Sequence, residues 1–198
     1  IGAIFYTAMQ AVPAFLPSVL AGKNIPCLIP LGVDQDIHFR VARDVIGKIG
    51  YYKPAIFHCR FMPSLQGINK KMSASEKETA IYTTDTPKEV EQKIKKYAFS
   101  GGQPTIEEHR KKGGNPDIDV AYQYLRMLFE PDDRKLKKLE EDYRAGKILS
   151  GEMKLILTEK VLKFIEEHRA RREEAKELLH LYMYDGELAR EMWRKVHE

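Results

Sequence analysis

One short run in the first half of the chain carries side chains suited to binding a polyphosphate. In Lys71-Met72-Ser73-Ala74-Ser75, Lys71 is a compact cation on a flexible stem, and Ser73 and Ser75 add hydroxyl donors. Backbone N–H groups in such a turn add further anion-binding capacity. Lysine and serine are also common surface residues, so a solvated loop without a ligand is the alternative.

A second group of polar residues, Gly32-x-Asp34-Gln35, follows a short apolar run at residues 25–29. Ligands of open α/β sheets bind beyond the carboxyl ends of parallel strands. There a glycine lets the backbone approach a ribose, and polar side chains at a helix start can bond to it. The alternative is that Asp34 only caps the helix that follows.

The elements that must position these residues form a β-α-β unit. Residues 25–29 and 54–59 are apolar runs typical of buried parallel strands, and apolar spacing between them predicts a helix over 37–49 that Gly50 ends. The crossover is expected to be right-handed. A parallel sheet of two strands does not stand alone, and the chain begins at Ile1 without methionine, so we expect a piece of a longer protein.

The charge distribution predicts a boundary near residue 80. The 198 residues include 33 Lys and Arg and 29 Asp and Glu, giving a net charge of +4. Residues 1–80 hold 9 basic and 5 acidic residues, whereas residues 81–198 hold 24 of each. We expect no membrane-spanning segment, and we expect Cys27 and Cys59 to be two buried thiols in a reducing cytosol.

The charge-dense second segment is predicted to be helical. Thr86, Pro87 and Glu89 form a helix-start signature with a capping residue, proline at the first helical position and glutamate three residues after the cap. The expected helices cover residues 87–97, 120–129, 131–145, 150–184 and 188–196.

With these elements in place, the run at 71–75 resembles the KMSKS-type loop of class I aminoacyl-tRNA synthetases. Ala74 stands where the second lysine would be, a form familiar from tryptophanyl-tRNA synthetases of the eukaryotic and archaeal type. The strings at 98–102, 105–110 and 113–115 resemble the helical domain of the same enzymes. The resemblance extends from about Met9 to the C-terminal helices.

The resemblance implies an α/β plus all-α fold. Residues 1–80 would be the second half of a Rossmann-type catalytic domain, and residues 81–198 a helical anticodon-binding domain. It implies activation of L-tryptophan with ATP and Mg²⁺, transfer to tRNA(Trp), a cytoplasmic location and a homodimer of the full-length enzyme. The His-x-Gly-His motif of the family is absent from the chain. We therefore expect no adenylate formation by this chain alone.

The resemblance also implies roles for individual residues. The catalytic residues would be Lys71, which stabilises the leaving pyrophosphate, with Ser73 and Ser75. The ATP-binding residues would be Gly32, Asp34, Lys71, Met72 and Ser73. Gln10, otherwise readable as a helix-surface residue, and Gln35 would contact tryptophan, and Lys154 would contact tRNA. No metal site is expected, because the six histidines lack metal-ligand spacing.

Two alternatives to this interpretation stay open. A fragment of a tyrosyl-tRNA synthetase would share the fold and the loop, although the strings at 99–102 and 107–109 favour the tryptophan enzyme. A fragment that binds tRNA without catalysis is the non-enzymatic alternative.

Overall fold

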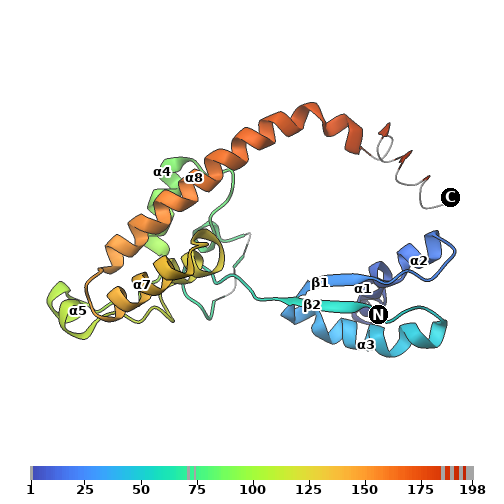
Figure 1. The fold of residues 1–198 in the computed structure, drawn as a ribbon, viewed down its shortest axis with the longest axis horizontal. Helices are drawn as coiled ribbons and strands as arrows, with labels where there is room; N and C mark the ends of the chain where they lie inside the picture. Colours follow the sequence, from blue (N-terminus) through green and yellow to red (C-terminus); the bar gives the residue numbers. More distant parts are fainter. Residues whose placement is uncertain are drawn as a thin grey trace. The chain divides into compact units, whose positions relative to one another are not determined.

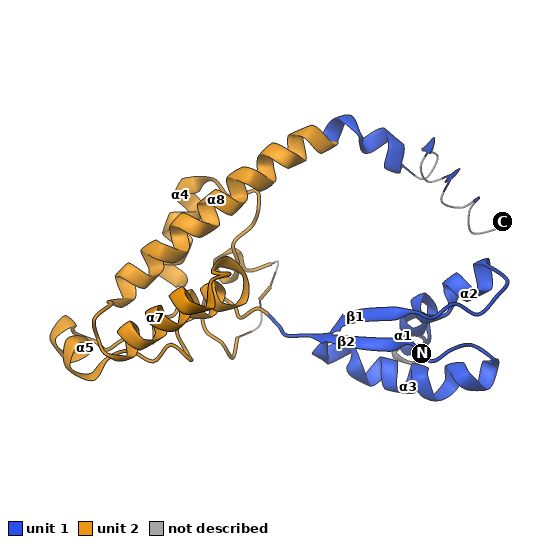
Figure 2. Cartoon of the chain, in the orientation of Figure 1, with its two compact units in different colours: residues 1–61, 176–198 blue, residues 62–175 orange. Residues whose placement is uncertain are grey.

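The chain forms two compact units, and each is described by itself. The computed structural model describes residues 2–70, 72–73, 75–183, 186–187, 190–191 and 194. Unit 1 comprises residues 1–61 and 176–198, and unit 2 comprises residues 62–175 (Figure 2). No helix among the described residues is long and apolar enough to cross a lipid bilayer.

Unit 1 contains the predicted β-α-β unit. Strands β1 (Leu28–Gly32) and β2 (Ala55–Cys59) pair in parallel, and helix α3 (Asp36–Ile46) connects them (Figure 1). Strand β1 begins three residues later than predicted and includes Pro30. Each strand of this two-stranded sheet is an edge strand, where proline is tolerated because its missing N–H is not needed for pairing.

Two helices that the sequence analysis did not predict precede the sheet. They are α1 (Gly2–Ala11) and α2 (Leu16–Leu20), and α1 packs against α3. A small cluster of buried side chains holds these elements together: Ala14, Leu31, Phe39, Ala42 and Ile46. The helical segment after α3 ends at Gly50 as predicted, and Gly50 adopts the left-handed conformation with φ of 90°.

The prediction that both strands are buried is wrong for this chain. Leu28 in β1 is 65% exposed and Phe57 in β2 is 62% exposed. The prediction of two buried thiols is also wrong, because Cys59 is exposed and Cys27 is only partly buried, although both are free. Since strand side chains alternate between two faces, a two-stranded sheet with few covering elements leaves many of them open to solvent.

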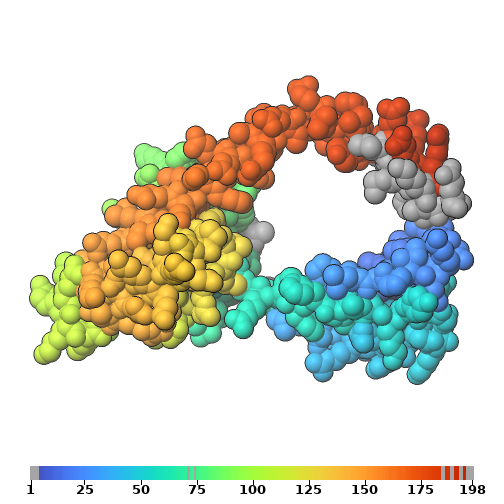
Figure 3. All heavy atoms as spheres, in the orientation of Figure 1, coloured from blue at the N-terminus to red at the C-terminus, as the bar shows by residue number. Residues whose placement is uncertain are grey.

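Unit 2 is helical, as predicted. Its helices are α4 (Pro87–Tyr97), α5 (Ile106–Lys112), α6 (Val120–Tyr124), α7 (Asp133–Arg144) and most of α8 (Ser150–Glu177), and the last part of the predicted helix at 120–129 is a π-helical turn. Figure 3 shows atoms of α7 and of the first half of α8 on the surface of this unit. The predicted capping box at the start of α4 is confirmed.

Helix α8 is shorter than predicted. It ends at Glu177 instead of near residue 184, and a 3₁₀ turn, Leu179–Tyr182, follows. Most of the predicted final helix at 188–196 lies outside the described residues.

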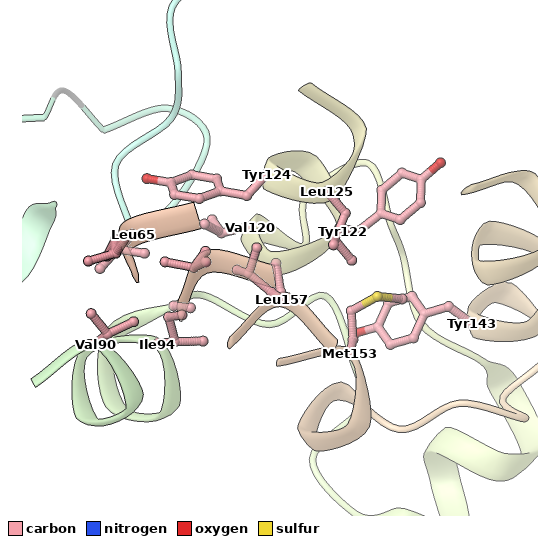
Figure 4. Close-up of a cluster of buried hydrophobic side chains, with 14 residues drawn as sticks. Leu65, Val90, Ile94, Val120, Tyr122, Tyr124, Leu125, Tyr143, Met153 and Leu157 are labelled. Carbon is pink, nitrogen blue, oxygen red and sulfur yellow. The ribbon is translucent and has the colours of Figure 1, made fainter. Parts of the chain in front are cut away.

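A single hydrophobic cluster fills unit 2. Ten of its side chains are labelled in Figure 4: Leu65, Val90, Ile94, Val120, Tyr122, Tyr124, Leu125, Tyr143, Met153 and Leu157. Leu65 belongs to this cluster although it precedes residue 80, and the Tyr124 hydroxyl donates a hydrogen bond to the Pro63 carbonyl at 2.7 Å. The compact units therefore divide between residues 61 and 62, while the charge density changes near residue 80.

Candidate functional site

The two glutamines expected to contact tryptophan lie together in unit 1. Gln10 is in the last turn of α1, and its Nε2 donates a hydrogen bond to Oε1 of Gln35 at 3.2 Å. The same Nε2 donates to the Tyr6 hydroxyl at 2.7 Å. Tyr6 was not among the predicted residues, but it precedes Gln10 by four positions, so both occupy one helix face.

Gly32 and Asp34 stand at the carboxyl end of β1, as predicted. A Cβ atom at Gly32 would lie 3.0 Å from Asp34 Oδ1 and 3.0 Å from the Phe61 ring, so a side chain there would crowd both. Asp34 is exposed and has no hydrogen-bond partner among the described residues. Helix α3 has Gln35 as its N-cap residue, with no side-chain capping bond. The carboxylate of Asp34 is therefore open to a ligand and is not engaged in capping.

A polar cluster fixes the start of α3 against the end of β2. Oδ1 of Asp36 lies 2.7 Å from Nε2 of His58, and Nε of Arg40 donates to Oδ2 at 2.6 Å. The hydrogen bond with His58, followed by that with Arg40, lowers the pKa of Asp36. These three residues were not among the predicted site residues. Asp36 follows the first strand and His58 lies near the end of the second, and since the carboxyl ends of parallel strands meet at one edge of a sheet, this spacing is the signal that could have found the cluster.

The loop at residues 71–75 belongs to unit 2, and two of its predicted site residues meet there. Ser73 Oγ and Ser75 Oγ lie 2.8 Å apart. Met72 is partly buried and lines an apolar cavity of about 180 Å³ together with Met62 and Ile81. Lys71 and Ala74 lie outside the described residues, so the role expected of Lys71 stays a prediction.

Thr79 anchors this loop, and the sequence analysis missed it. Thr79 is 2% exposed, and its Oγ1 accepts a hydrogen bond from the Ser73 N–H at 3.1 Å. The same oxygen lies within donating distance of the Ser73 carbonyl at 3.0 Å and of the Glu76 carbonyl at 2.7 Å. The backbone N–H of Leu65 donates to the Thr79 carbonyl at 2.9 Å. The loop is thus fastened to the core of unit 2.

Lys154 lines a cavity of about 870 Å³ between α4, α5 and the start of α8, which we term the α8 cavity. Its Nζ donates a hydrogen bond to the Lys95 carbonyl at 3.1 Å. Burial lowers the pKa of Lys154, and the negative charge of Asp119 opposes that effect. The other lining residues are Glu91, Lys95, Gln103, Pro104, Thr105, Ile106, His109, Leu149, Ser150, Gly151, Glu152, Leu155, Thr158, Glu159 and Leu162.

This cavity offers both apolar surface and charge. Two lysines, Lys95 and Lys154, can contact phosphate groups, whereas the carboxylates of Glu91, Glu152 and Glu159 accept hydrogen bonds from ligand donors. Among the described residues, no group of three or more His, Cys, Asp or Glu side chains is arranged to hold a metal ion.

The matches to known proteins include residues of both units. Residues 1–166 match the family described as tRNA synthetases class I (W and Y). The tryptophan–tRNA ligase of Sulfurisphaera tokodaii is 60% identical over 198 residues, which is 100% of this chain and 50% of that protein. The chain thus spans about half the length of the curated relatives it matches.

Solved structures agree with the sequence comparison. The tryptophanyl-tRNA synthetase of Plasmodium falciparum superposes with a TM-score of 0.76 at 45% identity, covering 87% of this chain and 46% of that one. The tyrosyl-tRNA synthetase of Aeropyrum pernix superposes with a TM-score of 0.61 at 25% identity, covering 81% and 46%. The chain belongs to the class I tRNA synthetase family that groups the tryptophan and tyrosine enzymes.

Proposed function

We propose that this chain is the C-terminal part of a tryptophan–tRNA ligase, with a Rossmann-type segment at residues 1–80 and a helical anticodon-binding domain at residues 81–198. The observation that carries the proposal is the 60% identity to the S. tokodaii ligase along the whole chain. The lower identity of 25% to the A. pernix tyrosyl enzyme disfavours the tyrosine alternative. The same proposal includes a cytoplasmic location and a homodimer for the complete enzyme.

The proposed reaction has two steps. A carboxylate oxygen of tryptophan attacks the α-phosphorus of ATP, the bond to the β-phosphate oxygen breaks, and pyrophosphate leaves. A ribose hydroxyl of tRNA(Trp) then attacks the tryptophanyl carbonyl, and AMP leaves. Mg²⁺ bound to the triphosphate of ATP would offset part of its negative charge. Such displacements depend chiefly on positioning and on stabilisation of developing charge.

The described residues of unit 1 have assignable parts in this reaction. The Gln10 and Gln35 amides, 3.2 Å apart, would bind the ammonium and carboxylate groups of tryptophan. The open carboxylate of Asp34, beside Gly32, would accept hydrogen bonds from the ribose of ATP.

The loop in unit 2 would act on the phosphates. Ser73, which Thr79 holds, and Ser75, which contacts Ser73, would donate to phosphate oxygens, and Met72 would keep the loop on the core. Lys71 would stabilise the negative charge that develops on pyrophosphate.

A chimera tests the proposal. In it, these 198 residues replace the matching half of the S. tokodaii ligase, and ATP–pyrophosphate exchange is measured with tryptophan and with tyrosine. Tryptophan-dependent exchange is expected, with none for the 198-residue chain alone. Exchange only with tyrosine, or exchange by the isolated chain, would contradict the proposal.

Lys71→Ala in the chimera should lower the exchange rate by about 10²- to 10³-fold, the cost of removing one preorganised charge-stabilising group. Lys70→Ala is the matched control, because Lys70 is an exposed neighbour whose Nζ lies 3.5 Å from Gln66 Oε1. A loss below threefold for Lys71→Ala would remove Lys71 from the mechanism.

We also propose that Lys154, in the α8 cavity, contacts tRNA. The same binding experiment tests the alternative in which the chain binds tRNA without catalysis. Filter binding of tRNA(Trp) to the 198-residue chain, repeated across a salt titration, is expected to give an affinity that falls as salt rises. Lys154→Ala should weaken binding more than Lys163→Ala, an exposed lysine on the same helix. Equal effects of the two variants would remove Lys154 from the interface.

A further inference from the structure

Two pairs of polar side chains join helix α1 to the start of α3. Besides the hydrogen bond between Gln10 and Gln35, Oγ1 of Thr7 lies 2.9 Å from Nδ1 of His38. Thr7 precedes Gln10 by three residues, and His38 follows Gln35 by three, so the two pairs lie about one helical turn apart. Because the later residue of α1 meets the earlier residue beside α3, the helices run antiparallel in this contact.

The ring of His38 makes a second contact with α1. The rings of Tyr6 and His38 pack edge to face, with their centroids 5.1 Å apart. The Tyr6 hydroxyl accepts a hydrogen bond from Nε2 of Gln10, and the same Nε2 donates to Gln35. His38 therefore contacts both Thr7 and the tyrosine that binds Gln10.

Helix α1 depends on these polar contacts because it buries little apolar surface. Among residues 5–11, whose side chains the structure describes, none is buried, and Phe5 and Met9 are 63% and 69% exposed. Apolar packing therefore contributes little to fixing the position of α1 along α3. Hydrogen bonds fix it better, since they require a donor and an acceptor at a defined distance and angle. Of the two polar pairs, only that of Thr7 and His38 lies outside the proposed tryptophan contacts.

We propose that His38 is a positioning residue for tryptophan binding. Its hydrogen bond with Thr7 fixes α1 against α3, and the amides of Gln10 and Gln35 are thereby held 3.2 Å apart. The inference rests on the proposed function, in which these two amides bind tryptophan. Neither Thr7 nor His38 needs to touch the substrate, because a displacement of about 1 Å between the amides is enough to weaken binding of the ligand that they share.

The test measures tryptophan-dependent ATP–pyrophosphate exchange by the chimera with the S. tokodaii ligase. Thr7→Val and His38→Phe each remove the hydrogen bond and keep the approximate size of the side chain, and His38→Phe also keeps a ring against Tyr6. Each should raise KM for tryptophan about fivefold, as expected for loss of one hydrogen bond. KM for ATP should change less than about twofold, because the ATP contacts expected of Gly32 and Asp34 do not involve α1.

KM separates positioning from a loss of stability. A variant that only folds less well lowers the concentration of active enzyme, and thus the maximal rate, at an unchanged KM. Ser18→Ala is the matched control, because the buried Ser18 hydroxyl accepts a hydrogen bond from the Ile25 N–H at 2.9 Å, outside the contact between α1 and α3. It should leave KM for tryptophan unchanged. Thr7→Ser keeps the hydroxyl and should keep this KM within about twofold of the native value.

A double variant shows whether the two residues act together. If Thr7 and His38 act through one hydrogen bond, combining Thr7→Val with His38→Phe should raise KM for tryptophan no more than either change alone. Effects that multiply would mean that His38 acts on the substrate independently of Thr7, and they would overturn the inference.

The remaining outcomes distinguish this inference from the function on which it rests. No tryptophan-dependent exchange by the unaltered chimera would overturn the proposed function and this inference with it. Exchange by the unaltered chimera, with KM for tryptophan unchanged in both single variants, would overturn the inference alone. So would equal rises in KM for tryptophan and for ATP. Thr7→Val decides the matter if His38→Phe does not fold.

Discussion

The two units of this chain bury their apolar residues to very different degrees. Among the described residues, fourteen side chains form the buried cluster of unit 2, and five form that of unit 1. Yet both strands of unit 1 are apolar runs, and Leu28 and Phe57 on them are 65% and 62% exposed. Parallel strands are normally covered on both faces. An apolar run therefore predicts that a segment forms a strand of a sheet. Whether the side chains of that strand are buried depends on which elements cover the sheet.

The same contrast applies to polar groups. In unit 2, the buried carboxylate of Asp119 has three hydrogen-bond donors, and the buried carboxylate of Glu130 pairs with Lys160 at 2.9 Å. In unit 1, the pair formed by Asp36 and Arg40 is open to solvent on the arginine side. Exposed ion pairs contribute little to stability. We therefore expect unit 2 to be the more stable unit.

The largest expected effect is that of Leu157→Ala in unit 2. Leu157 is fully buried, and removing its side chain leaves a cavity in the cluster, at a cost of about 4 kcal/mol in the free energy of unfolding. Leu28→Ala in unit 1 removes the same atoms from an exposed position and should cost less than about 0.5 kcal/mol. Urea unfolding gives the free energies.

Amide hydrogen exchange followed by mass spectrometry assigns these effects to a unit. Leu157→Ala should accelerate exchange in α4 and α8 and leave β1 and β2 unchanged. Equal costs for Leu157→Ala and Leu28→Ala would contradict the contrast between the units.

Sequence patterns predicted helices and strands well where residues close together in the sequence determine them. The capping residues Thr86 and Glu89 determine the start of α4 by contacts within four residues. The parallel pairing of β1 and β2 was also predicted, because the helix between the strands sets their direction. Helix α5 was missed, since at seven residues it is too short to show a clear apolar period.

Features that depend on distant contacts were not predictable from spacing. Thr79 fastens the loop at residues 71–75 through Ser73, and Asp119 contacts Tyr143 across 24 positions of sequence. Nothing in a single sequence indicates which buried donors meet. The approach of Gln10 to Gln35 was anticipated only through the family resemblance. Burial of Cys59 was wrongly predicted because a strand pattern does not report whether its covering layer is present.

A smaller effect is expected when the buried ion pair of unit 2 is broken. The hydrogen bond from Lys160, together with that from the Asp132 N–H, holds the pKa of Glu130 below its ordinary value of 4.5. The ionised pair therefore stabilises the fold above pH 4.5, and this contribution is lost as the pH falls through the lowered pKa. Lys160→Met should cost about 1 kcal/mol at pH 7, because Lys160 itself is one-third exposed, and almost nothing at pH 3.

Urea unfolding at the two pH values checks this dependence. Lys163→Met, an exposed lysine on the same helix, is the control and should change stability at neither pH. A cost for Lys160→Met that is the same at pH 7 and pH 3 would mean that lost packing of the lysine stem, and not the charge of Glu130, is the cause.

The smallest effect is expected for Phe57→Thr on the open face of unit 1. Phe57 is 62% exposed, and threonine suits a strand, so the free energy of unfolding should change by less than about 0.5 kcal/mol. Phe39→Thr, at a side chain that is 4% exposed in the same unit, is the matched control and should cost about 3 kcal/mol, within the range for large core truncations. If Phe57→Thr instead costs more than about 1.5 kcal/mol, the strand face is covered in solution. Repeating the urea unfolding at several protein concentrations would then identify the cover, because stabilisation by a second copy of the chain depends on concentration and covering by the chain itself does not.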